Sequence, residues 1–296
     1  MHISEQRFGE LSQLISDALF HSAITHEHLK ITPINEGAIN RNFHVLATTK
    51  TVLDDKRAEV SEKRFLAKFF ANNEKLPVNR RRQFRLQASL SKQGLAPKPI
   101  FLSQDQTVYI EEWVPALNSL GTEKRQITIA YLATLLNKIH STALDPTLLH
   151  QLDLSADWQH YMAFIFDDCY LHLNKEEKEN LRQEHKDILP VLGAYQHEHQ
   201  HDLVLCHHDL HLSHVSGNHS ICFDWEYAAA SSRYFDLACT IKSNEFSATQ
   251  SNSLIETYAA ASGLEVSVIK KCTGNAMELV NFTNKLWWLL TKDTNG

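Results

Sequence analysis

Two aspartates, each placed just after an apolar run, are the residues of this sequence best suited to chemistry. Asp209 follows the run 204–206, and Asp224 follows the run 221–223, fifteen positions further along the chain. We expect the two carboxylates on adjacent strand ends, with His214 between them. In such a pair, one carboxylate accepts a proton from an attacking hydroxyl while the other holds a divalent metal ion.

A second feature is a concentration of histidines, which is also typical of zinc or nickel sites. The alternating set in 197–201 falls in a polar connection before the strand that leads to Asp209. No cysteine or carboxylate set at helical zinc-ligand spacing accompanies it, so we expect a solvated linker there. The eight histidines are His197, His199, His201, His207, His208, His211, His214 and His219.

Composition excludes several classes of protein. The chain has 296 residues, and 29 Lys and Arg against 35 Asp and Glu give a net charge of −6. An acidic chain of this kind offers no general basic face, so we expect no nucleic-acid and no membrane partner. Apolar runs such as 286–290 are far shorter than the roughly 20 residues of a membrane-spanning helix. The first residues carry no secretory pattern, which predicts a cytoplasmic protein.

Cysteine and glycine usage narrows the chemistry further. The five cysteines form no C-x-x-C pair, which favours buried thiols over a disulfide framework or a zinc ribbon. Glycines number only 9, and neither G-x-G-x-x-G nor G-x-x-x-x-G-K-[ST] occurs. A dinucleotide fold and a P-loop are therefore both disfavoured.

The elements that must position the aspartates fall into two parts. Residues 42–48 and 64–70 are rich in β-formers, and the polar stretch 49–63 between them predicts a long hairpin connection. Helical spacing follows over 79–93, closed by Gly94, and 108–114 is a further strand candidate. Apolar steps of three and four in 129–139 and 279–289 predict buried helix faces, whereas 174–186 reads as a solvated helix surface. We place domains at 1–112 and 113–296.

Several motifs resemble one family. His207-x-Asp209-x-His211-x-x-His214 resembles the H-x-D-x-H-x-x-N loop of the aminoglycoside phosphotransferase and choline kinase superfamily, and 223–228 resembles its I-D-W-E-Y-A element. Within that superfamily, the residues of these motifs are most similar to those of bacterial choline and thiamine kinases. The ordered set covers roughly residues 30 to 245. Its other members are the phosphate-covering loop 35–42, the strand lysine Lys68, the segment 94–97, the hinge 111–115, the helix 135–140 and the element 233–238.

The resemblance implies an α+β, two-lobed protein-kinase-like fold with a small β-rich first lobe and a larger, mainly helical second lobe. It implies transfer of the ATP γ-phosphoryl group to a hydroxyl of a small molecule, with Mg²⁺ as the metal. The implied roles are Asp209 as base, Asp224 and His214 as metal ligands, Lys68, Gly37, Glu112 and Val114 as nucleotide-binding residues, and His207 and Asp236 as structural residues.

Two positions depart from the family pattern. His214 stands where an Asn usually supplies the second metal ligand, which shifts the expected preference towards Mn²⁺. Macrolide phosphotransferases resemble this chain in carrying His there. Gln83 stands where a helix glutamate usually pairs with the strand lysine, so Lys68 is either freer or paired elsewhere. A nucleotide-binding pseudokinase without transfer activity stays open as an alternative. A protein kinase is disfavoured because Asp-Trp-Glu replaces Asp-Phe-Gly and no Ala-Pro-Glu follows.

The acceptor is indicated only in outline. Trp225 and Glu226 directly follow the metal aspartate, and Trp288 lies on the late helix beside Trp287. Aromatic faces and a carboxylate suit a cationic acceptor such as choline, ethanolamine or thiamine. An antibiotic acceptor, an aminoglycoside or a macrolide, is the alternative, and the late tryptophans are equally well explained as core residues. Oligomeric state is not indicated.

Overall fold

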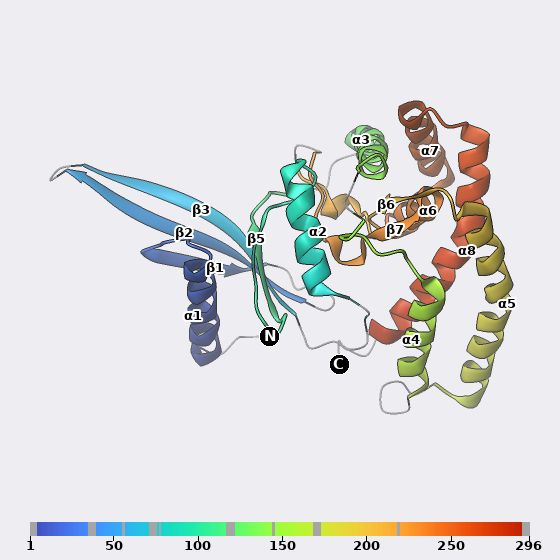
Figure 1. Ribbon diagram of the computed structural model, residues 1–296, viewed down its shortest axis with the longest axis horizontal. Coiled ribbons are helices and arrows are strands. Elements are labelled where there is room, and N and C mark those ends of the chain that lie inside the picture. Colours follow the sequence, from blue (N-terminus) through green and yellow to red (C-terminus); the bar gives the residue numbers. More distant parts are fainter. Residues whose placement is uncertain are drawn as a thin grey trace.

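The computed structural model describes residues 5–34, 40–54, 57–70, 76, 78–116, 122–143, 146–167, 173–217 and 220–291. A strand-rich part comes first and a mainly helical part follows, with helix α2 lying between them in Figure 1. This confirms the expected α+β class. The domain boundary at 112 stays a prediction, although the first sheet ends at that residue.

The first part is a five-stranded antiparallel sheet of order β1-β2-β3-β5-β4. Helix α1 (Glu5–His21) packs on it, because Ile15 and Leu19 are fully buried in the same apolar cluster as Phe43 and Val45. The strands are β1 (His28–Pro33), β2 (Asn40–Asp54), β3 (Arg57–Phe70), β4 (Pro99–Leu102) and β5 (Val108–Glu112).

The predicted long connection between β2 and β3 is wrong. The two strands continue through the polar stretch 49–63 and stay paired, with Lys50 opposite Val60. Figure 1 shows this hairpin projecting away from the rest of the sheet. Residues 59–64 of β3 are all exposed, Val60 by 59%, so solvent reaches both faces of this part of the hairpin. A strand exposed on both faces needs no apolar alternation, which is why its composition resembled a loop.

The predicted helix over 79–93 is confirmed as α2 (Arg80–Lys92). Asn79 caps its start, since the side-chain oxygen accepts a hydrogen bond from the Arg82 N–H at 2.9 Å. Gly94 follows its end with a φ of +66°, a left-handed conformation that glycine adopts without strain. This turn directs the chain into β4 and then β5.

The second part is mainly helical in the ranges that the structure describes, and its predicted core faces are confirmed. Ile129, Leu132, Leu136 and Ile139 are all buried, and so are Leu279, Phe282 and Leu286. The elements are α3 (Thr122–His140), α4 (Leu154–Phe166), α5 (Lys175–His199), β6 (Leu203–Cys206), the short turns η1 (Leu212–His214) and η2 (Trp225–Tyr227), β7 (Ala229–Ser232), α6 (Arg233–Ser243), α7 (Ala248–Ser262) and α8 (Val266–Thr291).

Helix α5 confirms one expectation and corrects another. Asn174 and Glu177 form a capping box at its start, and the charged residues that follow are exposed, as predicted for 174–186. The helix then runs on to His199, so the expected polar linker at 197–201 is wrong for its first half. The expected histidine linker is instead the last turn of a helix whose His199 side chain is buried.

The cysteines and the membrane question can be settled for the described residues. Cys206, Cys222, Cys239 and Cys272 are free and buried, as expected, whereas Cys169 lies outside the described ranges. No helix among these ranges combines the length and the apolar character that crossing a bilayer requires. The cytoplasmic location stays a prediction.

Candidate active site

The loop after β6 is held from within by His207. This side chain is completely buried. Its Nε2–H donates to the Phe223 carbonyl at 2.7 Å, and its Nδ1 accepts the Asp209 N–H at 3.3 Å. Burial lowers the pKa of His207 to about 4, so the ring is neutral at pH 7 and can do both. The ring therefore joins the segment before Asp224 to the backbone of Asp209.

Asp236, at the start of α6, holds the same loop from the other side. Its carboxylate accepts the backbone N–H groups of His207 and His208 at 2.9 and 2.7 Å, and the Nε2–H of His140 at 3.0 Å. Burial alone would raise the pKa of Asp236, but the His140 hydrogen bond and the nearby His208 outweigh it and hold that pKa well below its usual range. A buried carboxylate with three donors is a structural anchor.

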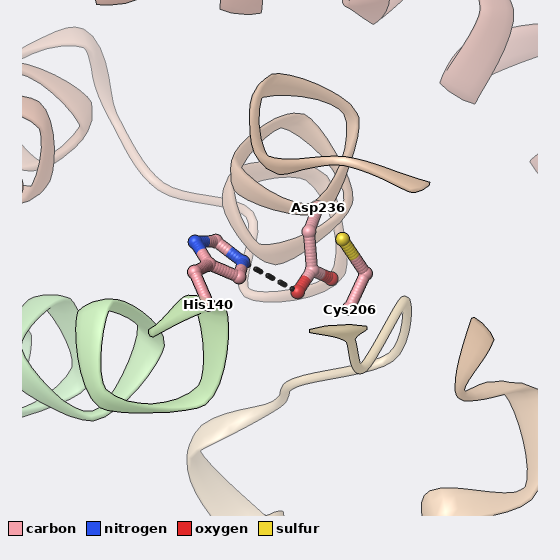
Figure 2. A group of neighbouring side chains, drawn as sticks. All are labelled: His140, Cys206 and Asp236. Carbon is pink, nitrogen blue, oxygen red and sulfur yellow. Dashed lines mark hydrogen bonds and ion pairs between the residues drawn. The ribbon is translucent and has the colours of Figure 1, made fainter. Parts of the chain in front are cut away.

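Figure 2 shows Asp236 facing the ring of His140, with Cys206 beside them. The three side chains come close enough to share a metal ion, since their donor atoms all lie within 4.8 Å of one another. Hydrogen bonds already engage the donor atoms, however, because His140 Nδ1 lies 2.7 Å from the Tyr258 hydroxyl and the Cys206 thiol donates to the Ser231 carbonyl. The arrangement is explained by hydrogen bonding alone.

Asp224 is presented in an unusual backbone conformation. Its φ and ψ are +63° and +55°, in the left-handed region that few residues other than glycine adopt. An antiparallel bridge between Val215 and Cys222 and the hydrogen bond from Phe223 N–H to the His214 carbonyl fix the turn. Strain of this kind, held by surrounding hydrogen bonds, is concentrated at functional sites.

His214 lies between the two aspartates, as the sequence predicts. Its Nδ1–H donates to the Asp209 carbonyl at 2.8 Å, and the same atom is 3.7 Å from the Asp209 carboxylate. This leaves the Nε2 lone pair free to face Asp224, whose Oδ2 is 3.9 Å away. A nitrogen and a carboxylate oxygen at that separation can bind one divalent ion.

The pKa values of the two carboxylates are shifted in opposite directions. Burial raises the pKa of Asp209 to about 7, although the imidazole of His214 opposes the rise. Burial would also raise the pKa of Asp224, but the ammonium of Lys68 and the ring of His214 outweigh it and hold that pKa well below its usual range. One carboxylate is therefore poised to take up a proton and the other stays charged, which is how paired acids divide their roles.

Lys68 lies where the sequence predicts, and it is paired. Its Nζ donates to Asp224 Oδ1 at 2.9 Å and lies 3.6 Å from Glu111 Oε1. The second partner is on β5, which pairs with β3, so lysine and glutamate share one face of the sheet. Gln87 of α2 donates to the same Glu111 carboxylate. The carboxylate that accompanies Lys68 thus comes from a strand, while α2 contributes an amide.

Gln83 is not in contact with Lys68. Its Oε1 accepts a hydrogen bond from Arg80 at 3.0 Å. Arg80 also forms an ion pair with Glu226 of η2, and its guanidinium lies 3.7 Å from the centre of the Phe70 ring. This arginine connects the start of α2 with the turn that follows Asp224.

A cavity of about 400 Å³ opens beside Asp209, within the usual range of small-molecule sites. Residues of both parts of the chain line this cavity. The second part contributes Asp209, Trp225, Glu226, Tyr227, Trp287 and Trp288.

The predicted aromatic residues contribute unequally to this cavity. Trp225 is 1% exposed, and its Nε1–H donates to the Cys222 carbonyl, so most of the ring belongs to the core. Trp288 is 54% exposed. Trp287 is fixed by a hydrogen bond from its Nε1–H to the Tyr227 hydroxyl at 3.1 Å.

The predicted hinge offers one clear backbone donor. The N–H of Glu112 donates to the Lys98 carbonyl at 2.9 Å, and that of Trp113 donates to the Arg64 carbonyl at 3.0 Å. The Val114 N–H has no backbone acceptor within the described part of the chain. Gly37 lies outside the described residues, as does most of the predicted phosphate loop.

Sequence reasoning missed four residues of the site, which are Arg80, Glu111, Asp157 and Tyr161. Glu111 could have been found, because strand alternation places it on the face of its strand that carries Tyr109. Asp157 and Tyr161 line the cavity from α4, and nothing in their local sequence distinguishes them from other residues on a helix.

Comparisons with known proteins agree with this geometry. Residues 30–271 match the model of the phosphotransferase enzyme family. A comparison with curated protein sequences gave no match. In structure, the chain is similar to the choline kinase LicA of Streptococcus pneumoniae, with a TM-score of 0.68 and 16% identity, over 96% of this chain and 91% of that one.

Two further solved structures show the same fold. An ethanolamine kinase of Plasmodium vivax gives a TM-score of 0.70 at 17% identity, over 97% of this chain and 82% of that chain. The gentamicin complex of APH(2")-IIa gives 0.67 at 13% identity, over 100% and 93%. Such identities establish a shared fold, and the family match covers most of the sequence. This chain belongs to the phosphotransferase enzyme family.

Proposed function

We propose that this protein transfers the γ-phosphoryl group of ATP to a hydroxyl of a small, cationic metabolite. The observation that carries the proposal is the position of His214. On one side of it, Asp209 faces the cavity, and on the other, Asp224 faces Lys68. An acceptor hydroxyl in the cavity and a phosphate beside Lys68 would therefore meet between the two carboxylates.

In this proposal Asp209 orients the acceptor hydroxyl and takes its proton. A base is most effective when its pKa lies near the working pH, and the raised pKa of Asp209 meets that condition. His207 and Asp236 act structurally, because their hydrogen bonds keep the Asp209 backbone in place.

Asp224 and His214 would hold the divalent ion. A carboxylate oxygen suits Mg²⁺, and the imidazole nitrogen, a softer ligand than an amide oxygen, moves the preference towards Mn²⁺. Such an ion neutralises phosphate charge as the transferring group moves.

Lys68 would bind the phosphates as a point charge, held ready by Asp224 and Glu111. At the hinge, the N–H of Val114, which has no backbone acceptor among the described residues, and the carbonyl of Glu112 would bind the adenine edge. Gly37 stays a prediction for close approach of the backbone to the phosphates.

The acceptor class follows from the lining of the cavity. Asp157 and Glu226 bring negative charge, and the rings of Tyr161, Trp287 and Trp288 offer aromatic faces. Glu226 is already paired with Arg80, whereas Asp157 has no basic partner within salt-bridge distance among the described residues. A cationic acceptor would bind between Asp157 and the rings, and choline, ethanolamine and thiamine have that character.

The test is ADP release with Mg²⁺ and with Mn²⁺ across choline, ethanolamine, thiamine, an aminoglycoside and a macrolide. We expect turnover on one of the first three, and a loss of roughly 10²-fold or more in Asp209→Asn. Turnover on an antibiotic alone would replace the proposed acceptor class. ATP binding without turnover on any acceptor would instead support a pseudokinase.

A further inference from the structure

The last turn of α5 and the beginning of α8 bring three side chains with metal-binding atoms together. Glu198 and His199 come from α5, and Cys272 comes from α8, 73 residues later in the sequence. Their donor atoms all lie within 4.8 Å of one another. None of the three residues lies in the loop after β6 or lines the cavity. His199 is one of the clustered histidines that the proposed reaction does not use.

His199 is the most informative of the three. It is 6% exposed, and its Nε2 has no hydrogen-bond partner among the described residues. The nearest carboxylate oxygen, on Glu198, is 4.0 Å away, too far for a hydrogen bond. Rings of Tyr195 and Tyr234 lie 4.5 and 5.1 Å from the imidazole ring and restrict its rotation. A buried polar atom without a partner lowers the stability of the fold, and a ligand bound to it would restore the lost interaction.

Cys272 supplies the second buried donor. It is a free cysteine that is 4% exposed, and its thiol makes no hydrogen bond with another described residue. A thiolate, an imidazole nitrogen and a carboxylate oxygen form the donor set that Zn²⁺ binds tetrahedrally, with water in the fourth position. We propose that Glu198, His199 and Cys272 form a zinc site that links α5 to α8.

The group formed by His140, Cys206 and Asp236 provides the contrast. It has the same types of donor within the same 4.8 Å, but its atoms are engaged in hydrogen bonds, of which Figure 2 shows the one between His140 and Asp236. Only the group at the end of α5 combines compactness with an imidazole nitrogen that has no partner, within the described ranges.

The zinc site is separate from the proposed reaction. Cys272 and Trp287 are both on α8, fifteen residues and therefore about 22 Å apart along the helix axis. Zinc at this site stabilises the packing of two helices and does not touch the acceptor. Failure of the phosphotransfer proposal would leave this one standing, and the reverse is also true.

Cobalt is the probe, because Co²⁺ bound to a thiolate gives a charge-transfer band in the near ultraviolet. We expect untagged, reduced protein titrated with Co²⁺ to show this band, and Zn²⁺ to displace it stoichiometrically. The band should vanish in Cys272→Ser and weaken strongly in His199→Gln. Zinc binding should weaken by roughly tenfold or more in both variants.

Two matched variants complete the design. His197→Ala removes an exposed histidine from the same helical turn, and Cys206→Ser removes the thiol of the contrasting group. Both should keep the band, and zinc should raise the melting temperature of His197→Ala as it does that of the natural chain. The proposal is overturned if the natural chain gives no band, or if the band survives in Cys272→Ser and disappears in Cys206→Ser. Far-ultraviolet circular dichroism checks that each variant is folded.

Discussion

The ammonium group of Lys68 lies 3.6 Å from the carboxylate of Glu111 on the neighbouring strand, and their side chains are only 6% and 1% exposed. Burial raises the pKa of Glu111, and the lysine opposes that rise. Both charged members of the pair come from the sheet, and helix α2 supports them only through the amide of Gln87. The strand carboxylate replaces the helix glutamate that the family resemblance led us to expect at Gln83.

Glu111→Gln tests this replacement. The substitution keeps the shape of the side chain and removes the charge, so Lys68 keeps only Asp224 as an anionic partner. We expect kcat/KM for ATP to fall about tenfold, equivalent to about 1.4 kcal/mol, because Lys68 loses the ion pair that helps to position its ammonium group. Glu62→Gln, an exposed change on β3, is the control and should leave the ATP kinetics unchanged. Equal kinetics for the two variants would contradict the role of Glu111.

His214→Asn tests the metal preference. The amide offers a harder oxygen ligand than imidazole nitrogen, so we expect the ratio of activity with Mn²⁺ to activity with Mg²⁺ to fall by roughly fivefold. Initial rates at saturating ATP measure this ratio in both proteins. An unchanged ratio would mean that the ring does not bind the ion.

Asp157→Asn should increase stability while weakening acceptor binding. Burial raises the pKa of Asp157 from its usual 3.8 to about 6, and nearby Asp153 adds to the rise. The folded protein therefore binds this proton more tightly, and its stability falls as the pH rises from about 4 to 6. At pH 7 the variant should gain about 1 to 2 kcal/mol, after allowance for partial exposure.

Urea unfolding at pH 7 and pH 4 measures the effect on stability, and the gain should disappear at the lower pH. Steady-state kinetics at pH 7 should show a higher KM for the cationic acceptor and an unchanged KM for ATP. If Asp157→Asn changes the free energy of unfolding but leaves the KM for the acceptor unchanged, Asp157 does not bind the acceptor.

Asp236→Asn should have the opposite effect on stability. The variant loses a buried charge that accepts three hydrogen bonds, which costs about 3 to 5 kcal/mol. Because the pKa of Asp236 is lowered by folding, its contribution is present above the unfolded pKa of about 3.9 and is lost as the pH falls below that value. The difference in the free energy of unfolding between Asp236→Asn and the natural chain should therefore decrease at acidic pH. Asp187→Asn, an exposed change on α5, should show no such difference at any pH.

Two glycines should respond in opposite directions to alanine. Gly94 has a φ of +66°, so Gly94→Ala introduces strain of about 1 kcal/mol although nothing lies within 4 Å of the new methyl group. Gly193 lies inside α5 with equally open surroundings, so Gly193→Ala should gain about 0.5 to 1 kcal/mol. Thermal unfolding of both variants gives the signs, and a loss in each would contradict the explanation.

The centre of the proposed active site could be predicted from sequence because its residues are neighbours in the chain. Asp209, His214 and Asp224 lie within sixteen residues, and a local turn brings them together. Glu111, Arg80 and Asp157 reach the site only through tertiary contacts, which local pattern does not encode.

The errors in secondary structure have a physical cause as well. The β2–β3 hairpin has a polar sequence, and the last turn of α5 has a histidine, His199, at its buried position, so neither shows the apolar periodicity on which prediction depends. Cys272, which we propose as a metal ligand together with His199, comes from α8, and no spacing within 197–219 could indicate it.

The order of the elements along the chain has a consequence for synthesis on the ribosome. Nearly all pairings in the first sheet join strands close in sequence, so this lobe can assemble while the remainder is still being translated. Helix α8, which supplies Trp287 and Trp288 to the cavity, emerges after all the other described elements. A nascent chain released within α8 would keep Lys68, Asp209 and Asp224 but lack one wall of the cavity, so in the proposed reaction the nucleotide site would form before the acceptor site.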